Sequence, residues 1–168
     1  MSDIFEGTVV WVFPDHFDVD LIIGIQNVRE NDIDKIVPFC MSAYEPDWNA
    51  KVKPGDIIVA GRNFGYGHAH PQAMATMRKT GVNVVLAESF APGFFRAEIG
   101  NGMVLLTVPG ITGFTRRFDR LSVDFDSGMI RNLSQDATIT GLAPGPMARS
   151  LVKGKGYRQF LLDEIGKL

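Results

Sequence analysis

The chain has few of the residues that cross-link a fold or hold metal ions. Cys40 is its single cysteine, and it has three histidines among 168 residues. One thiol cannot form an internal disulfide, and it is compatible with a reducing cytoplasm, where we expect the protein. One thiol also cannot hold an iron–sulfur cluster within this chain, because such clusters commonly need several thiolates. Any such cluster would have to come from another chain.

Long apolar runs and a strong charge of either sign are also missing. No apolar run approaches the roughly 20 residues that a membrane helix needs, and residues 1–6 do not have the basic and apolar regions of a signal peptide. The formal net charge of −2 argues against a nucleic-acid-binding surface. We therefore expect no membrane partner and no nucleic acid. The length and a hydrophobic content of 45% predict one globular domain over residues 1–168.

The central part of the chain has the pattern of a strand, a glycine loop, a helix and a second strand. An apolar run at 57–60 stops at Gly61, a loop follows, a helix is expected over 72–79, and a second apolar run covers 82–87. This order predicts a right-handed parallel crossover. Groups that contact ligands usually lie at the carboxyl ends of such strands, where the loop is. Two of the three histidines, His68 and His70, fall in that loop.

The remaining pattern is mixed. Strands are expected at 6–13, 103–108, 121–126, 129–133 and 137–142, and helices from Asn31 toward Met41, over 91–99 with Ser89 as its cap, over 147–152 and over 157–168.

Four separated segments carry a resemblance to a known family. They are Lys51-Val-Lys-Pro-Gly-Asp-Ile-Ile-Val-Ala-Gly-Arg-Asn-Phe-Gly65, residues 87–91, residues 128–133 and the closing Gly154-Lys-Gly156 segment, all in the right order. With these segments the chain resembles the small subunit of 3-isopropylmalate dehydratase, which corresponds to the swivel domain of aconitase. The resemblance implies an α/β fold, a three-layer β/β/α swivelling domain, with a central parallel βαβ unit and C-terminal helices.

The resemblance also implies an enzyme that works only with a partner. In that family a large subunit carries a [4Fe-4S] cluster, and the pair removes and re-adds water on a small hydroxy-di- or tricarboxylate, as in leucine biosynthesis. The small subunit closes over the substrate and supplies the base and the carboxylate-binding groups. A heterodimer or heterotetramer is implied, with no cofactor on this chain. Self-association of the isolated chain stays open.

The glycine loop departs from the family pattern. The family loop continues as Gly-x-Gly-Ser-Ser-Arg-Glu-His, with a serine as base and the arginine on a substrate carboxylate. This chain has Gly65, Gly67, His68, Ala69 and His70 in that stretch. A histidine can accept a proton near neutral pH, so His68 is the candidate base. His70, if protonated, is a candidate carboxylate-binding group, and Gly65 and Gly67 belong to the same candidate substrate site.

Three further residues are candidates for substrate binding. The family loop Pro-Gly-Arg-Tyr-Leu helps to set substrate choice, and here Gln26 occupies its arginine position while Arg29 lies close by. Arg62 follows the strand that ends at Ala60 and is expected to line the cleft. The family match also places Asp18 or Asp20 at the cleft.

Three explanations of the His68 and His70 pair stay open. The first is a retained hydro-lyase with a changed substrate, since strict 3-isopropylmalate isomerisation is less expected without the usual base and anchor. The second is a merely structural pair in a non-catalytic binding or regulatory protein on the same fold. The third is metal binding, which two ligands support only weakly, and we expect no metal on this chain.

Overall fold

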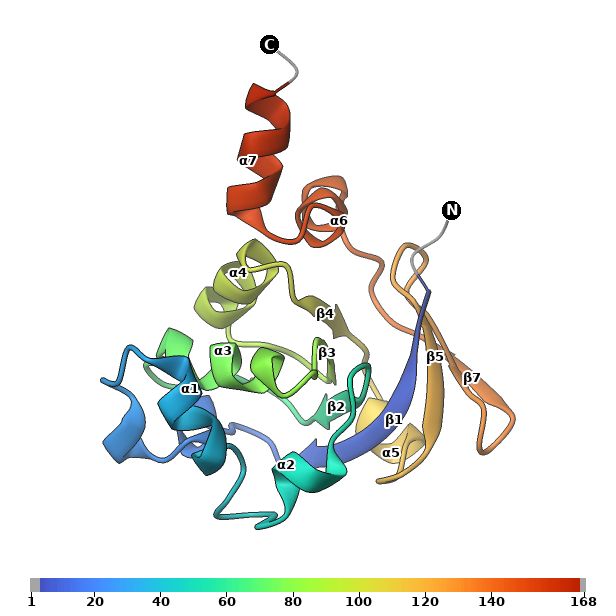
Figure 1. Ribbon diagram of the computed structural model, residues 1–168. Coiled ribbons are helices and arrows are strands. Elements are labelled where there is room, and N and C mark those ends of the chain that lie inside the picture. Colours follow the sequence, from blue (N-terminus) through green and yellow to red (C-terminus); the bar gives the residue numbers. More distant parts are fainter. Residues whose placement is uncertain (1–3, 167–168) are drawn as a thin grey trace.

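The computed structural model describes residues 4–166, and seven strands of these residues form one mixed sheet (Figure 1). The order across the sheet is β4-β3-β2-β1-β5-β6-β7. Strands β1 to β4 are parallel, and β1, β5, β6 and β7 are antiparallel neighbours. The strands are β1 (Ile4–Phe13), β2 (Ile57–Ala60), β3 (Val84–Ala87), β4 (Val104–Thr107), β5 (Arg120–Asp124), β6 (Met129–Asn132) and β7 (Ala137–Thr140).

Strand β1 belongs to both halves of the sheet. Its first half pairs with β5 from Ile4 to Thr8, and its second half pairs with β2 from Val9 to Phe13. The register shifts between Val9 and Trp11, and such an irregularity bends a strand. Figure 1 shows β1 as a long curved strand, with the short parallel strands on one side and β5 and β7 on the other. The two β layers are therefore the two halves of one curled sheet.

The parallel half is the most deeply buried part of the molecule. All four residues of β2 and all four of β3 are buried, and both strands consist of Ile, Val, Leu and Ala. Strands covered on both faces need such continuous apolar runs, because neither face meets water. The buried apolar side chains form a core cluster that includes Trp48, Phe64 and Phe125 from different parts of the chain.

Helices connect the parallel strands and close the C-terminal end. Helix α3 links β2 to β3, and α4 links β3 to β4. Helix α1 and η1 pack on α3, while α6 packs on α4. The helical segments are η1 (Val19–Ile22), η2 (Ile25–Asn27), α1 (Ile33–Ile36), η3 (Val37–Phe39), α2 (Trp48–Lys51), α3 (Pro71–Lys79), α4 (Pro92–Gly100), α5 (Ile111–Phe114), α6 (Pro146–Lys153) and α7 (Tyr157–Ile165).

The structure confirms the expected α/β fold, with its central parallel βαβ unit and its C-terminal helices. The strands expected at 121–126 and 129–133 are also present, as β5 and β6, and they pair as an antiparallel hairpin. Within residues 4–166, no helix has the length and apolar character that crossing a bilayer requires. The end of the last predicted helix, at 167–168, lies outside the described residues.

Two helix predictions need correction. The helix expected from Asn31 toward Met41 ends after one turn at Ile36 and continues as the short 3₁₀ segment η3. Pro38 explains this break, since it has no backbone N–H to extend an α-helix. Ser89 does not cap α4, whose N-cap is Ala91 without a side-chain hydrogen bond. The Ser89 hydroxyl instead accepts a hydrogen bond from the Asn63 backbone N–H at 2.8 Å.

Candidate active site at the carboxyl ends of the parallel strands

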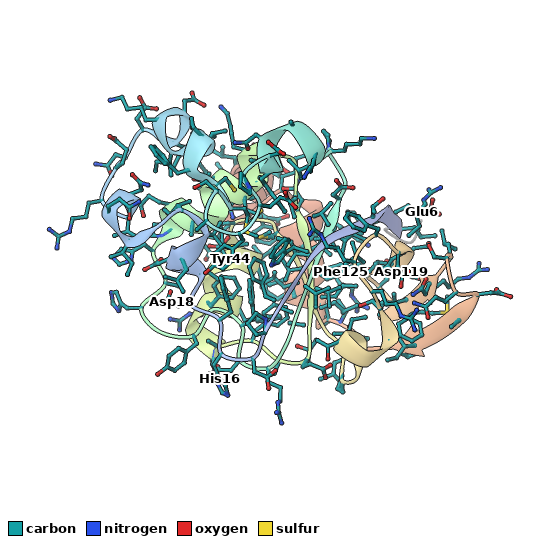
Figure 2. The ribbon with its side chains drawn as sticks, turned by 90° about the horizontal axis from the view of Figure 1, so that it is seen from below. Glu6, His16, Asp18, Tyr44, Asp119 and Phe125 are labelled. Carbon is teal, nitrogen blue, oxygen red and sulfur yellow. The ribbon has the colours of Figure 1, made fainter. Side chains whose placement is uncertain are left out.

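Three loops meet at the carboxyl ends of β1, β2 and β3. The Gly65 N–H donates to the Phe17 carbonyl at 3.2 Å, which joins the loop after β2 to the loop after β1. The Phe64 N–H donates to the Ser89 carbonyl at 3.0 Å, which joins it to the loop after β3. Backbone hydrogen bonds therefore hold the glycine loop in place from both sides. In Figure 2, His16, Asp18 and Tyr44 lie toward one end of the molecule, with Glu6 and Asp119 toward the other.

Gly65 and Gly67 give the loop its shape. Both have a positive φ, +81° and +89°, which favours glycine. A Cβ atom at Gly65 would lie 2.2 Å from the Phe94 ring, so the loop backbone rests directly on helix α4. A Cβ atom at Gly67 would lie 3.4 Å from the Asp18 carboxylate. The loop is thus held between α4 and the segment that precedes η1.

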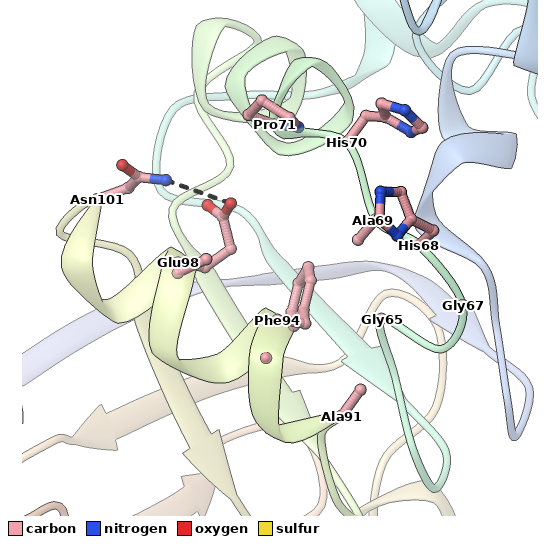
Figure 3. A pocket seen from close by; sticks show the side chains of 12 residues that line it. Gly65, Gly67, His68, Ala69, His70, Pro71, Ala91, Phe94, Glu98 and Asn101 are labelled. Atoms are coloured by element: carbon pink, nitrogen blue, oxygen red, sulfur yellow. Dashed lines mark hydrogen bonds between the residues drawn. The ribbon is translucent and has the colours of Figure 1, made fainter.

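A pocket of about 270 Å³ lies between the glycine loop, the start of α3 and helix α4 (Figure 3). Gly65, Gly67, His68 and His70 line it. The two imidazole rings are 5.5 Å apart between centroids and 72° apart in plane. His68 is exposed and His70 is half-buried, so neither ring is sealed in the core.

Helix α4 supplies the opposite wall, which the sequence did not single out. Phe94 packs in the core and lines the pocket at the same time. Glu98 lines it too and is 3% exposed. Its carboxylate pairs with the Arg78 guanidinium of α3 and accepts a hydrogen bond from the Asn101 amide at 3.3 Å. The helical spacing of Phe94, Glu98 and Asn101, which puts all three on one face of α4, was the sequence signal that could have revealed this wall.

Asp20 binds His70 at two points. Its Oδ2 lies 2.7 Å from His70 Nδ1, and its Oδ1 accepts a hydrogen bond from the His70 backbone N–H at 2.9 Å. Asp20 is only 7% exposed. The family match led us to expect Asp18 or Asp20 at the cleft, and in the structure Asp20 contacts His70, which lines the pocket. Its partner was not visible in the sequence, since the two residues are 50 positions apart.

Arg62 is engaged at the rim of the loop region and does not line the pocket. Its Nε donates to Asp15 Oδ2 at 2.9 Å, and its backbone N–H donates to Asp15 Oδ1 at 2.7 Å. The backbone hydrogen bond first, and then the guanidinium, hold the pKa of the Asp15 carboxyl below its ordinary value. In this conformation the Arg62 guanidinium has an internal carboxylate partner and 73% of its side chain is exposed.

Gln26 and Arg29 are exposed and lie outside the lining of this pocket. Gln26 is in η2, and its side-chain amide folds over Gly24, where a Cβ atom would meet it at 2.6 Å. Arg29 follows Val28, the C-cap of η2. The structure therefore separates these two residues from the pocket that holds the histidine pair.

The donor groups of the described residues do not fit a metal or cluster site. Among residues 4–166, no three His, Cys, Asp or Glu side chains are grouped so that they could hold a metal ion. Cys40 is buried, and burial raises the pKa of its thiol to about 12, which disfavours the thiolate that a metal needs. No step of the chemistry below is therefore assigned to a metal on this chain.

Comparisons with known proteins point to one family. The model of the aconitase C-terminal domain matches residues 25–110. The isopropylmalate/citramalate isomerase small subunit of Methanocaldococcus jannaschii is 32% identical over 99% of both chains. The 3-isopropylmalate dehydratase small subunit of Desulfovibrio desulfuricans is 39% identical, over 90% of this chain and 93% of that one.

A solved structure agrees with these sequences. The crystal structure of a 3-isopropylmalate dehydratase from Methanocaldococcus jannaschii superposes with a TM-score of 0.86 at 28% identity, over 97% of this chain and 96% of that one. These matches confirm the resemblance predicted from the four segments, and the chain belongs to the aconitase C-terminal domain family, among the small subunits of dehydratases.

Proposed function

We propose that the protein is the small subunit of a hydro-lyase that adds or removes water on a small hydroxy-di- or tricarboxylate. Family membership supports this assignment, because relatives over nearly the whole chain are named as small subunits of such enzymes. A small subunit needs a larger partner, and we propose one that carries an iron–sulfur cluster, in a heterodimer or heterotetramer. Bound on that partner, the cluster would supply a Lewis acid for the substrate hydroxyl.

The single observation that carries the proposal is the shared pocket of His68 and His70. It lies where the crossover fold presents ligand-contacting groups, at the carboxyl ends of parallel strands. Its volume of about 270 Å³ suits a small acid, and its second wall is largely apolar around Phe94. Two basic rings beside an apolar wall are suited to a carboxylate with a short carbon chain.

His68 is proposed as the base. His68 is exposed and lines the pocket, and among the described residues its ring packs against the ring of His70. A neutral ring nitrogen there can take the proton from the substrate carbon next to a carboxylate. The electron pair of that C–H bond then forms the C=C bond as the C–O bond breaks, and the hydroxide leaves and gains a proton as water. Hydration is the reverse, with no change in oxidation state.

His70 is proposed as the carboxylate-binding group. The Asp20 carboxylate lies 2.7 Å from ring Nδ1, and a protonated ring would donate a strong hydrogen bond from Nε2 to a substrate carboxylate. The ring lies just before helix α3, whose first turn has free N–H groups that also favour an anion. Pro71 in that turn removes one donor but leaves the others. Imidazole has no bidentate fork, so we propose a substrate that differs from that of relatives with an arginine here.

The experiment is anaerobic co-expression with a cluster-bearing large subunit from the same genome. The complex is purified and assayed on a panel of hydroxy acids, with the wild-type chain, His68→Ala and His16→Ala compared. We expect turnover on at least one acid and a fall in kcat of about 10²- to 10⁴-fold in His68→Ala. His16 is the matched control, since it contacts Asn63 and Tyr66 and does not line the pocket.

Two outcomes would count against the proposal. If His68→Ala keeps the full rate in an intact complex, the base is another group. If no large subunit binds, or the wild-type complex turns over no acid, a non-catalytic binding or regulatory role takes the place of the hydro-lyase.

A further inference from the structure

We infer that Asp20 is a positioning residue that fixes the orientation and the hydrogen placement of His70. This inference rests on the proposed function for its catalytic meaning, although the Asp20–His70 contact stands on its own geometry. It adds to His68 and His70 a third functional residue, which lies on η1, a segment far from the glycine loop in the sequence.

One carboxylate holds both the backbone and the ring of His70. Oδ1 accepts from the backbone N–H at 2.9 Å, and Oδ2 meets ring Nδ1 at 2.7 Å. The first contact fixes the position of the His70 backbone, and the second fixes the rotamer of its ring. A carboxylate of this kind only accepts, so ring Nδ1 carries a hydrogen, and Nε2 of the protonated ring is the donor left for a substrate carboxylate.

The position of Asp20 is itself built into the fold. Its backbone N–H donates to the Asp18 carboxylate at 3.0 Å, which caps η1. Its neighbours Val19 and Ile22 are 0% and 1% exposed, and η1 packs on α3. A carboxylate that is 7% exposed needs hydrogen-bond partners, because burying an unpaired charge is costly. The two contacts to His70 meet that need, so the buried acid and the ring depend on each other.

The remaining charged groups near the ring do not replace Asp20. His68 is 5.5 Å away between ring centroids and is a base rather than an acid. Asp18 is beside Gly67, and its Oδ1 accepts the η1 hydrogen bond. Glu98, across the pocket on α4, is paired with Arg78. Asp20 is thus the carboxylate in contact with the ring.

This arrangement separates the roles of two chemically identical side chains. His70 has a carboxylate partner 2.7 Å from its ring, and this contact orients the ring for a hydrogen bond to a substrate carboxylate. The contact given for the His68 ring among the described residues is with the His70 ring, and no carboxylate orients it.

The first test uses nitrogen-15 NMR of the histidine rings in the isolated subunit. In the wild type we expect a hydrogen on Nδ1 of His70 whether or not Nε2 is also protonated, and in Asp20→Ala we expect that signature to be lost while the His68 signals change little. Asp20→Asn is expected to fall between the two, because its amide offers one acceptor to two donors. Identical His70 signals in wild type and Asp20→Ala would overturn the inference. Circular dichroism checks that each variant folds.

The second test uses the active complex. We expect Asp20→Ala to raise KM at least tenfold and to change kcat less. We expect the Asp20→Ala/His70→Ala double variant to have nearly the same KM and kcat as His70→Ala alone. Additive effects would mean that Asp20 acts independently of His70, against the inference. If the wild-type complex is inactive but the NMR signature is present and depends on Asp20, the proposed function fails while the positioning of His70 by Asp20 holds.

Discussion

At the scale of single residues, the site depends on how closely the glycine loop approaches helix α4. Gly65 has φ +81°, and the space that a side chain would need is occupied by the Phe94 ring. Position 65 therefore requires glycine. Gly93, one residue before Phe94 on α4, does not meet the same restriction, because an added Cβ there would have no atom within 4 Å. The two glycines therefore form a matched pair for measuring what the close approach contributes.

We expect Gly65→Ala to lower the free energy of unfolding by about 2 kcal/mol or more, from left-handed strain together with displacement of Phe94. Gly93→Ala should leave it unchanged or raise it by roughly 0.5 kcal/mol, since alanine favours a helix over glycine. Urea unfolding of both variants gives the comparison. Equal free energies for the two would show that the loop does not rest on Phe94 as described.

At the scale of elements, the antiparallel half is stabilised by a buried carboxylate before β5. Asp119 accepts hydrogen bonds from the Asn132 amide at 2.8 Å, the Gln135 amide at 2.5 Å and the Arg116 backbone N–H at 2.9 Å. Burial raises the pKa of Asp119, but these hydrogen bonds outweigh it, and the net pKa is below the ordinary value of 3.8. The acid thus ties the chain before β5 to β6 and to the turn that follows β6.

This pKa direction has a defined consequence for stability. A carboxyl whose pKa is lower in the folded state stabilises the fold above its unfolded pKa, and that contribution is lost as pH falls through the folded pKa. We expect Asp119→Asn to be less stable than wild type at neutral pH and to lose less stability on acidification below about pH 4. Thermal unfolding from pH 7 to pH 2 measures this. Parallel curves for the two proteins would show that Asp119 is not a source of the acid sensitivity.

Elements set by nearby residues could be predicted from the sequence, whereas contacts between distant loops could not. The apolar runs around Ile58 and Val85, with Gly81 between the helix and the second strand, determine the crossover locally. The contact between Asp20 and His70 depends on how η1 packs against α3, and no local pattern encodes that packing. For the same reason, the prediction that Arg62 lines the cleft did not foresee its pairing with Asp15.

At the scale of the whole molecule, the pocket lies between the glycine loop, the start of α3 and helix α4, which follow the parallel strands β2 and β3. The pocket contains two basic rings, an apolar wall and a paired carboxylate, but no grouping of metal ligands among residues 4–166. A hydro-lyase of this family would therefore be completed by its partner, and this chain would contribute proton transfer and carboxylate binding. On the proposal that His68 and His70 stand in for a serine and an arginine of the family loop, this would be a distinct version of the site.

The most direct test of this account is the steady-state kinetics of His68→Ala and His70→Ala in the intact complex. A base and a carboxylate-binding group should fail differently, so we predict that His68→Ala lowers kcat by about 10²-fold or more with KM within threefold. His70→Ala should raise KM at least tenfold with a smaller change in kcat. Equal, small changes in both constants for both variants would contradict the assignment of catalysis to this histidine pair.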